Sequence, residues 1–260
     1  ANEPAGFTYK LAACPDLNML PVGRLDPNAI KLLNLFPNPT SNALTSNYTN
    51  SPVLRENRKA FDARLDVNFT QKDQVFYRFS YVDDPQFIPS IFGGVADGGG
   101  FYQGNQTALA QQSALVWNHV ISPTTVNNAR AGLNYLHTTR NIPEATNLSD
   151  LPGQFGILGI PQQKENGGLP AFGINGLQTL GGNAFLPSDE VSSTIQLNDD
   201  FTKIYGKHTF KMGIEWQHVK FSTLQPPWSR GQFNFDGTYT DIPNVGGGNT
   251  GRAQFLLSPE

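Results

Sequence analysis

Apolar and polar residues alternate without interruption over residues 61–70. The apolar positions are Phe61, Ala63, Leu65, Val67 and Phe69, and the polar positions are Asp62, Arg64, Asp66, Asn68 and Thr70. A period of two places the apolar side chains on one face of a β-strand and the polar side chains on the other. Residues 71–74 are compatible with a turn, and the alternation resumes over residues 75–81. The pattern predicts a β-hairpin with one apolar, aromatic face.

The same pattern occurs twice more along the chain. A second hairpin is predicted over residues 113–137, with a turn at residues 122–124. A third is predicted from about residue 193 to residue 221, with its turn at residues 205–208. A seventh strand is expected to start near Gly231. These elements together predict an all-β chain built as an antiparallel meander of amphipathic hairpins.

The connections between the hairpins are much longer than the turns inside them. Residues 83–110 and 138–192 are rich in Gly, Pro, Asn and Gln. Short turns at one end and long loops at the other are typical of outer-membrane β-barrels, whose strands need about 9–11 residues to cross the bilayer. The pattern therefore favours an outer-membrane β-barrel with long loops of the extracellular type. The alternative is a soluble sandwich in which two apolar faces pack against each other.

The first sixty residues lack this alternation and contain one predicted helix, near residues 27–36. Asp26 can cap it, Pro27 suits its first turn, and the helix is expected to end at the Pro37-Asn38-Pro39 sequence. The chain is thus predicted to have two regions. Residues 1–58 form an irregular loop region with this short helix, and residues 59–260 form the antiparallel hairpin region of the barrel segment.

The composition agrees with such a chain. Hydrophobic residues make up 38% and charged residues 15%, with 26 Gly and 19 Pro, because half of every amphipathic strand is polar and the loops are rich in turn formers. An aromatic content of 11% argues against disorder. The net charge of −3 disfavours nucleic acid as a partner, since phosphate binding needs clustered Lys and Arg.

Several common features are missing from the sequence. Cys14 is the only cysteine, which excludes an intrachain disulfide framework and a Cys-rich metal site. No run of 18 apolar residues predicts a transmembrane helix, and residues 1–4 do not resemble the start of a signal peptide. Because the chain does not start with Met, we expect it to be a processed product or a piece of a longer protein.

A search for catalytic, cofactor-binding and metal-ligating motifs identifies none. The four histidines, His119, His137, His208 and His218, lack the spacing of a zinc motif. No GxSxG sequence marks a serine nucleophile. The Gly-rich residues 246–253 lack the Lys and Ser/Thr of a phosphate-binding loop, and residues 93–100 are expected to be a mobile loop. We therefore predict no catalytic residue, no cofactor and no metal.

The sequence contains two pairs of adjacent carboxylates. Asp83-Asp84 and Asp199-Asp200 could contribute to a Ca²⁺ site, although calcium loops spread more oxygen ligands at fixed offsets. The alternative is that these are charges at strand ends that face water. The row formed by Asp62, Arg64 and Asp66 on one strand and Arg78 on the next instead predicts a polar network facing the barrel lumen, in which each cross-strand pair contributes about 0.2–1 kcal/mol.

The aromatic residues allow three interpretations. They could form a girdle at the membrane interface, an ordinary β-core, or a stacking platform for sugars that includes the loop residues Phe101 and Tyr102. His218 follows Trp216 on one strand face and could belong to such a girdle. The candidate residues of the strands are Phe61, Phe69, Tyr77, Phe79, Tyr81, Trp117, Tyr135, Trp216 and Phe221.

Six segments of the sequence, taken in order, carry a family resemblance. Their order along residues 20–257 makes the resemblance stronger than any one segment does. These segments are Leu20-Pro21-Val22-Gly23-Arg24-Leu25-Asp26-Pro27 with residues 32–39, Phe61-Asp62-Ala63-Arg64-Leu65-Asp66 with residues 77–81, Ile121-Ser122-Pro123-Thr124 with residues 125–132, Gly206-Lys207-His208-Thr209-Phe210-Lys211-Met212-Gly213, Gly231-Gln232-Phe233-Asn234-Phe235, and Ala253-Gln254-Phe255-Leu256-Leu257. Together they resemble the large TonB-dependent outer-membrane receptors of the Oar-like type that is abundant in Acidobacteria.

The resemblance implies a function that this chain alone cannot complete. Such receptors close a barrel of about 22 strands, and they carry a plug domain and a TonB-binding motif that this sequence lacks. The chain is therefore expected to be a fragment of the barrel region in the bacterial outer membrane. The parent receptor would import a scarce ligand, such as an iron chelate, a glycan or a peptide. Its partners would be outer-membrane lipid, an unknown small ligand and, only through the missing plug, the TonB system.

Two alternatives come from other functional classes. The first is an extracellular β-rich binding or self-assembling module derived from such a barrel, because open strand edges can pair with other copies and form fibres. The second is a hydrolase whose site is assembled from loop residues, although no motif identifies one. A role other than catalysis is favoured.

Overall fold

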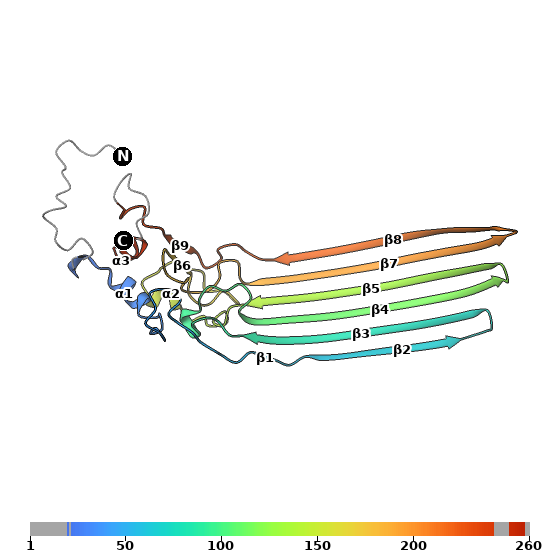
Figure 1. Cartoon of the computed structure of the whole chain (residues 1–260), viewed down its shortest axis with the longest axis horizontal. Coiled ribbons are helices and arrows are strands. Elements are labelled where there is room, and N and C mark those ends of the chain that lie inside the picture. Colours follow the sequence, from blue (N-terminus) through green and yellow to red (C-terminus); the bar gives the residue numbers. More distant parts are fainter. Residues whose placement is uncertain (1–19, 21, 242–249, 258–260) are drawn as a thin grey trace, which may run out of the picture.

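The computed structural model describes residues 20, 22–241 and 250–257. Cys14, the N-terminal residues 1–4 and residues 246–249 of the Gly-rich segment lie outside the described residues. A long antiparallel sheet extends from a lobe of loops and short helices (Figure 1). Its seven strands are β1 (Arg55–Glu56), β2 (Lys59–Asn68), β3 (Asp73–Ile88), β4 (Gly104–Ser122), β5 (Thr125–Asn141), β7 (Ser188–Tyr205) and β8 (His208–Leu224).

The sheet is a meander in which each long strand pairs with the next, in the order β2, β3, β4, β5, β7 and β8. β1 pairs with the far end of β3, next to β2. The apolar side chain of Leu65 is 62% exposed, so the predicted apolar face is not packed in a dry core. Among the described residues no second sheet covers this face (Figure 1). The antiparallel barrel-type fold is confirmed, and the soluble sandwich is wrong.

The strands are longer than the alternation predicts. β3 continues to Ile88 and β4 starts at Gly104, so the first long loop is residues 89–103 rather than 83–110. The second is residues 142–187 rather than 138–192. Strand pairing continues past the apolar segment because backbone hydrogen bonds with neighbouring strands do not require alternating side chains.

The hairpin turns lie at the opposite end of the sheet from the lobe (Figure 1). The first turn covers residues 69–72, two residues earlier than predicted, because the Phe69 amide donates to the Asp73 carbonyl (3.0 Å) and the Thr70 hydroxyl oxygen accepts from the Asp73 amide (3.0 Å). The third turn has Gly206 and Lys207 between the paired residues Tyr205 and His208. Gly206 has a φ of +60°, as the first central position of a type II′ turn requires.

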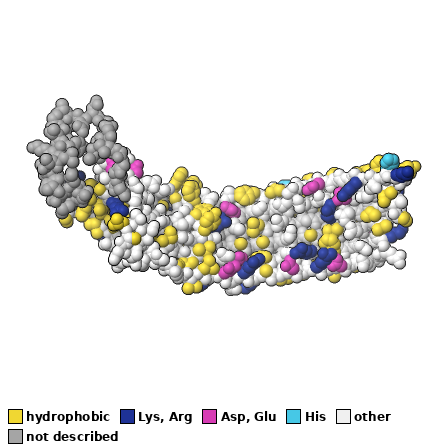
Figure 2. All heavy atoms as spheres, viewed as in Figure 1, with side chains coloured by type: hydrophobic (Ala, Val, Ile, Leu, Met, Phe, Trp, Pro, Cys, Tyr) yellow, Lys and Arg dark blue, Asp and Glu magenta, His cyan; other side chains and the backbone are white. Residues whose placement is uncertain are grey.

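The register separates the sheet into an apolar and a polar face. Near the turn end, one face carries a band of apolar side chains, which we call the apolar band: Ala63, Leu65, Val67, Val75, Tyr77, Phe79, Tyr81, Leu115, Trp117, Ala129, Ala131, Leu133, Ile195, Leu197, Ile214 and Trp216. Closer to the lobe, the same face is mixed, since the paired Thr107 and Thr139 lie between Pro85 and Asp189. On the side shown in Figure 2, acidic and basic side chains lie beside one another along the sheet.

The loop lobe comprises the described parts of residues 22–54, 89–103, 142–187 and 225–257. Its short elements are η2 (Val22–Arg24), α1 (Pro27–Leu33), η3 (Gly94–Ala96), α2 (Leu151–Gln154), β6 (Ala171–Ile174), β9 (Gln232–Phe235) and α3 (Gly251–Leu256). The predicted cap of α1 is confirmed, since Asp26 Oδ1 accepts from the amides of Asn28 (2.6 Å) and Ala29 (3.2 Å). The helix ends at Leu33, before the predicted Phe36.

The main hydrophobic core lies inside this lobe rather than on the long sheet. Buried residues from all of its loops pack together: Ala29, Leu32, Ala96, Leu151, Leu169, Phe172, Ile174, Leu180 and Phe255. The strand predicted near Gly231 exists as β9, but it pairs in parallel with β6 in a separate two-stranded sheet. It therefore belongs to the lobe and does not extend the hairpin series.

Candidate functional site

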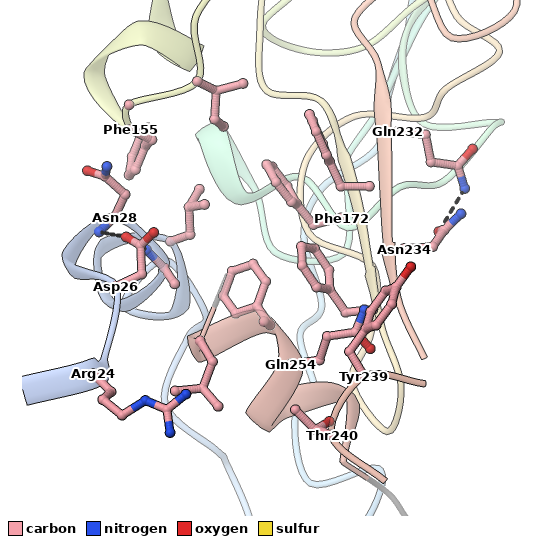
Figure 3. Close-up of a pocket in the computed structure, with 18 residues that line it drawn as sticks. Arg24, Asp26, Asn28, Phe155, Phe172, Gln232, Asn234, Tyr239, Thr240 and Gln254 are labelled. Carbon is pink, nitrogen blue, oxygen red and sulfur yellow. Dashed lines mark hydrogen bonds between the residues drawn. The ribbon is translucent and has the colours of Figure 1, made fainter. Parts of the chain in front are cut away.

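The loop lobe contains an open cavity of about 1070 Å³. Its walls come from α1, the segment after α2, β6, β9 and α3 (Figure 3). The lining residues are Arg24, Asp26, Asn28, Ala29, Leu32, Phe155, Gly156, Ile157, Phe172, Gln232, Phe233, Asn234, Phe235, Tyr239, Thr240, Gln254, Phe255 and Leu257. A concave, mostly apolar site with a few polar groups is the usual form of a ligand-binding pocket.

Phenylalanine rings build one wall of the cavity, which we call the phenylalanine wall: Phe172, Phe233, Phe235 and Phe255. The Phe172 and Phe233 rings stack with centroids 5.3 Å apart. Phe255 meets Phe235 edge to face at 4.9 Å and Phe172 at 6.2 Å. These contacts join β6, β9 and α3, so the wall exists only when three separate chain segments come together.

Polar groups lie around this apolar wall. Figure 3 places Arg24 and Asp26 on one side of the cavity and Gln232 and Asn234 on the other. The Gln232 amide group donates to Asn234 Oδ1 (3.2 Å). Gln254 Oε1 accepts from the backbone amide of Gly237 (2.7 Å), which holds the Gln254 side chain against the turn that follows β9. The site can therefore combine aromatic contacts with amide hydrogen bonds.

A buried arginine ties the loops of the lobe together. The Arg230 side chain is 1% exposed and donates to the carbonyl oxygens of Asn183 and Leu186, both at 2.8 Å. Its guanidinium also contacts Asn166 Oδ1 at 3.5 Å. Burial lowers the pKa of Arg230 to about 10, while the charge of Asp97 acts in the opposite direction.

Asp97 is the carboxylate whose negative charge acts on Arg230. Its side chain is 2% exposed, and neither carboxylate oxygen makes a hydrogen bond of normal geometry with the described residues. Burial raises its pKa to about 7, and Arg230 opposes that shift. The expectation of a mobile loop at residues 93–100 is therefore wrong for this segment, because Ala96 and Asp97 are buried and the Ala96 carbonyl accepts from Gly181 (2.9 Å).

The tandem carboxylates do not converge on a cation. Adjacent residues of a strand point to opposite faces. Asp199 accepts from Asn127 Nδ2 (2.6 Å), whereas Asp200 pairs with Arg130 on the other face. Asp83 and Asp84 are likewise neighbours within β3. No group of three or more His, Cys, Asp or Glu side chains suited to a metal ion occurs within the described part of the chain.

The predicted polar network between the first two long strands is present. Arg78 Nη2 lies 3.3 Å from Asp62 Oδ1, across the β2–β3 pair. Arg64 makes two contacts of 2.8 Å with Asp66 and also covers the Phe76 ring, with its guanidinium carbon 4.3 Å from the ring centroid. These side chains share the face opposite the apolar band.

Most of the aromatic residues proposed for the girdle lie on the face of the apolar band. Phe221 does not, since it pairs with Ser192 on the opposite face, and Phe69 lies in the first turn. His218 stacks on Trp216 with centroids 6.0 Å apart and an interplanar angle of 6°. The residues on the apolar face are Phe61, Tyr77, Phe79, Tyr81, Trp117, Tyr135 and Trp216.

The loop aromatics Phe101 and Tyr102 lie apart from the cavity. Their rings meet edge to face at 5.1 Å, and the Arg140 guanidinium carbon lies 5.6 Å from each centroid. Phe101 packs against the small buried cluster of Ile142 and Leu186, which leaves Tyr102 as the more exposed ring.

The sequence did not identify Phe155 or Phe172 as site residues. The only signal was an apolar residue within a Gly- and Pro-rich loop.

Comparison with known proteins gives one match. The family model described as "Outer membrane beta barrel domain" matches residues 3–258. No curated protein matches the chain. No solved structure matches it either. In the described residues, every helix is too short or too polar to span a membrane.

Proposed function

The chain belongs to the outer membrane beta barrel domain family, and from this premise we propose that it is a barrel segment of a TonB-dependent receptor that imports a scarce ligand. Membership places it in the bacterial outer membrane. Because outer-membrane barrels have short periplasmic turns and longer extracellular loops, the loop lobe faces outward. The apolar band then faces lipid and the charged network faces the lumen.

The dimensions of the sheet support this orientation. The apolar band extends along β3 from Val75 to Tyr81, which is about 20 Å at about 3.4 Å per residue. Outer-membrane barrels present an apolar band about 25 Å tall. Beyond Tyr81, β3 continues to Ile88, and its positions on this face are Asp83, Pro85 and Phe87. The charge of Asp83 ends the uninterrupted apolar band, so we place the ends of the strands above the membrane, where they carry the lobe.

The sheet edges support a barrel larger than this chain. β2 forms one edge and β8 the other, and neither pairs with the other among the described strands. Unpaired backbone amides are not tolerated in hydrocarbon. Additional strands must therefore pair with both edges in the membrane, as they would in a barrel of about 22 strands.

One observation carries the proposal of ligand import. Three sequence segments that resemble the TonB-dependent receptors meet around the lobe cavity, through Arg24, Gln232 and Phe255. They are distant in the sequence and share no strand of the long sheet. A large outward-facing cavity that is built from these segments is suited to capture a ligand before transport.

The proposal is tested with the full-length protein, which means the longer receptor of which this chain is a segment, purified in detergent. We expect the periplasmic domain of TonB, immobilised on a resin, to retain it, and excess soluble domain to release it. Bovine serum albumin on the same resin is the matched control. Folded protein that migrates as a heat-modifiable barrel, but is not retained by TonB, contradicts the proposal.

The open edges also favour a second candidate, a module that assembles with copies of itself. β8 has 17 residues whose outer edge is unpaired among the described residues, and long exposed edges template pairing. Sedimentation velocity in detergent separates the two candidates. A monomer that binds TonB supports the receptor, whereas concentration-dependent assembly without TonB binding supports the module.

A further inference from the structure

We propose that the lobe cavity binds an extended peptide, which adds as a third strand along the free edge of β9. Its side chains would pack on the phenylalanine wall, and a carboxylate of the peptide would pair with Arg24. This inference rests on the proposed function and names the class of ligand for that site.

The pairing of β9 leaves one of its edges free. On the paired edge, the carbonyls of Gly231 and Phe235 accept from the amides of Ala171 (3.3 Å) and Asn175 (2.9 Å) in and next to β6. The other side of β6 bonds to Leu180 through Phe172, so β6 lies between Leu180 and β9. Backbone groups alternate in direction along a strand. The backbone groups that point to β6 therefore belong to Gly231, Phe233 and Phe235. The backbone amides and carbonyls of Gln232 and Asn234 point away from β6.

No strand pairs with that second edge among the described residues. Four backbone groups are thus available, the amide and carbonyl of Gln232 and of Asn234. Both residues are exposed and line the cavity. A free strand edge is the surface that recognises an extended peptide in β-augmentation, where main-chain hydrogen bonds give affinity and pockets for alternate side chains give specificity.

The other walls determine which side chains would be accepted. The stacked pair of Phe172 and Phe233 and the edge-to-face pair of Phe235 and Phe255 present ring surfaces to the cavity. Aromatic rings favour offset-stacked or edge-to-face partners. Apolar, preferably aromatic, side chains of a peptide therefore fit this wall.

The charges of the site determine where a carboxylate would lie. Arg24 lines the cavity and makes no ion pair with the described residues. The nearby Asp26 already uses its Oδ1 to cap α1. An unpaired guanidinium matches a carboxylate with two parallel hydrogen bonds. A peptide with a free C-terminus, or with one acidic side chain, supplies that group.

The test uses five-residue peptides of alternating alanine and phenylalanine that carry an N-terminal fluorophore. Their fluorescence anisotropy is measured with the full-length protein in detergent. In one peptide series, N-methyl groups block the backbone amides of the even-numbered residues. In a second series, they block the backbone amides of the odd-numbered residues. We expect one series to bind at least tenfold more weakly and the other to bind like the parent peptide.

Protein variants test the same edge. Asn234→Pro removes the amide that faces the peptide without altering the Phe233 and Phe235 amides that face β6, and should weaken binding at least tenfold. Asn234→Ala is the matched control, because it removes the same side chain but keeps the backbone amide, and Asn234→Pro should bind at least tenfold more weakly than Asn234→Ala. Arg24→Gln should weaken the acid peptide to the affinity of its C-terminal amide and leave the amide peptide unchanged.

The outcomes separate this inference from the proposed function. Equal binding of the two N-methyl series, or no binding of the parent peptide, overturns strand addition even if the protein is retained by TonB. Because the peptides are tested on the unaltered protein, this holds even where Asn234→Pro does not fold. Register-dependent peptide binding without retention by TonB supports the peptide site and removes the receptor assignment.

Discussion

Phe172 and Phe233 stack across the β6–β9 pair, with ring centroids 5.3 Å apart and an interplanar angle of 13°. Phe172 belongs to the long loop between β5 and β7, and Phe233 belongs to the segment after β8. Phe172 is 3% exposed and also contacts Phe255. This stack therefore joins the chain segments that form the cavity and contributes to the core of the lobe.

Phe172→Ala is expected to weaken the lobe without unfolding the sheet. Loss of a buried phenylalanine costs about 3–5 kcal/mol, and the lost contacts all lie in the lobe. Hydrogen exchange of the full-length protein should show faster exchange over residues 142–187 and unchanged exchange over β3 and β4. Phe233→Ala, at a position that is 38% exposed, should have a smaller effect. Equal exchange in wild type and Phe172→Ala contradicts a role for the stack in holding the loops.

The stability of the lobe should decrease as the pH rises from about 4 to about 7. Burial raises the pKa of Asp97 from 3.8 to about 7, so the folded lobe binds this proton more tightly than the unfolded chain does. The free energy of unfolding of the lobe is therefore highest below pH 3.8, the pKa of the unfolded chain. It decreases by at most about 4 kcal/mol as the pH rises to about 7, the pKa in the folded lobe. Hydrogen exchange of residues 93–100, corrected for intrinsic rates, measures this loss.

Asp97→Asn provides the control for that pH dependence. The amide is similar in shape but does not titrate, so the variant should lose the part of the pH dependence that is due to Asp97. Arg230 stays charged over this range because its pKa remains about 10. The same pH dependence in wild type and variant would show that another group is responsible.

Substitution by alanine should lower the free energy of unfolding by very different amounts at two glycines with positive φ, Gly206 and Gly104. At Gly206 a Cβ atom has open space, so Gly206→Ala suffers only the backbone strain of about 1–2 kcal/mol. At Gly104 a Cβ atom would lie 2.0 Å from the Asn141 carbonyl oxygen, a backbone atom that cannot rotate away. Chemical denaturation in detergent should show a clearly larger loss for Gly104→Ala. Equal losses would contradict the close approach of β4 and β5 at the base of the lobe.

The long sheet could be predicted because its side chains alternate. Phe61 to Asn68 on β2 have one apolar and one polar face, and this pattern needs no knowledge of distant contacts. The strand ends were missed because residues such as Thr107 and Thr139 pair without an apolar pattern. Pairing there depends on the neighbouring strands, which a local pattern does not describe.

The lobe could not be predicted from local patterns. Asp97 lies in a segment with many glycines, and its surroundings come from distant residues, since it pairs with Gly181 and the charge of Arg230 acts on its pKa. The cavity depends on Phe172 and Phe255, which are far apart in the sequence. The α1 cap was found from Asp26 and Pro27 alone, because capping is a local interaction.

Neighbouring residues of β7 provide the strictest test of which face meets the lipid. Leu197 lies in the apolar band between Ala131 and Trp216, whereas Gln196 points to the opposite face, between Gly132 and Gln217. An arginine that faces lipid near the bilayer midplane costs about 2–4 kcal/mol in an outer-membrane barrel, whereas the polar lumen accepts it. Leu197→Arg should therefore lower the free energy of unfolding of the full-length protein in phospholipid vesicles, as measured by urea titration, and Gln196→Arg should leave it nearly unchanged. Because the two positions are adjacent, differences in height along the strand do not explain a contrast between them. If both variants lose the same stability, or if Gln196→Arg loses more, the assignment of the apolar band to lipid and of the charged network to the lumen is wrong.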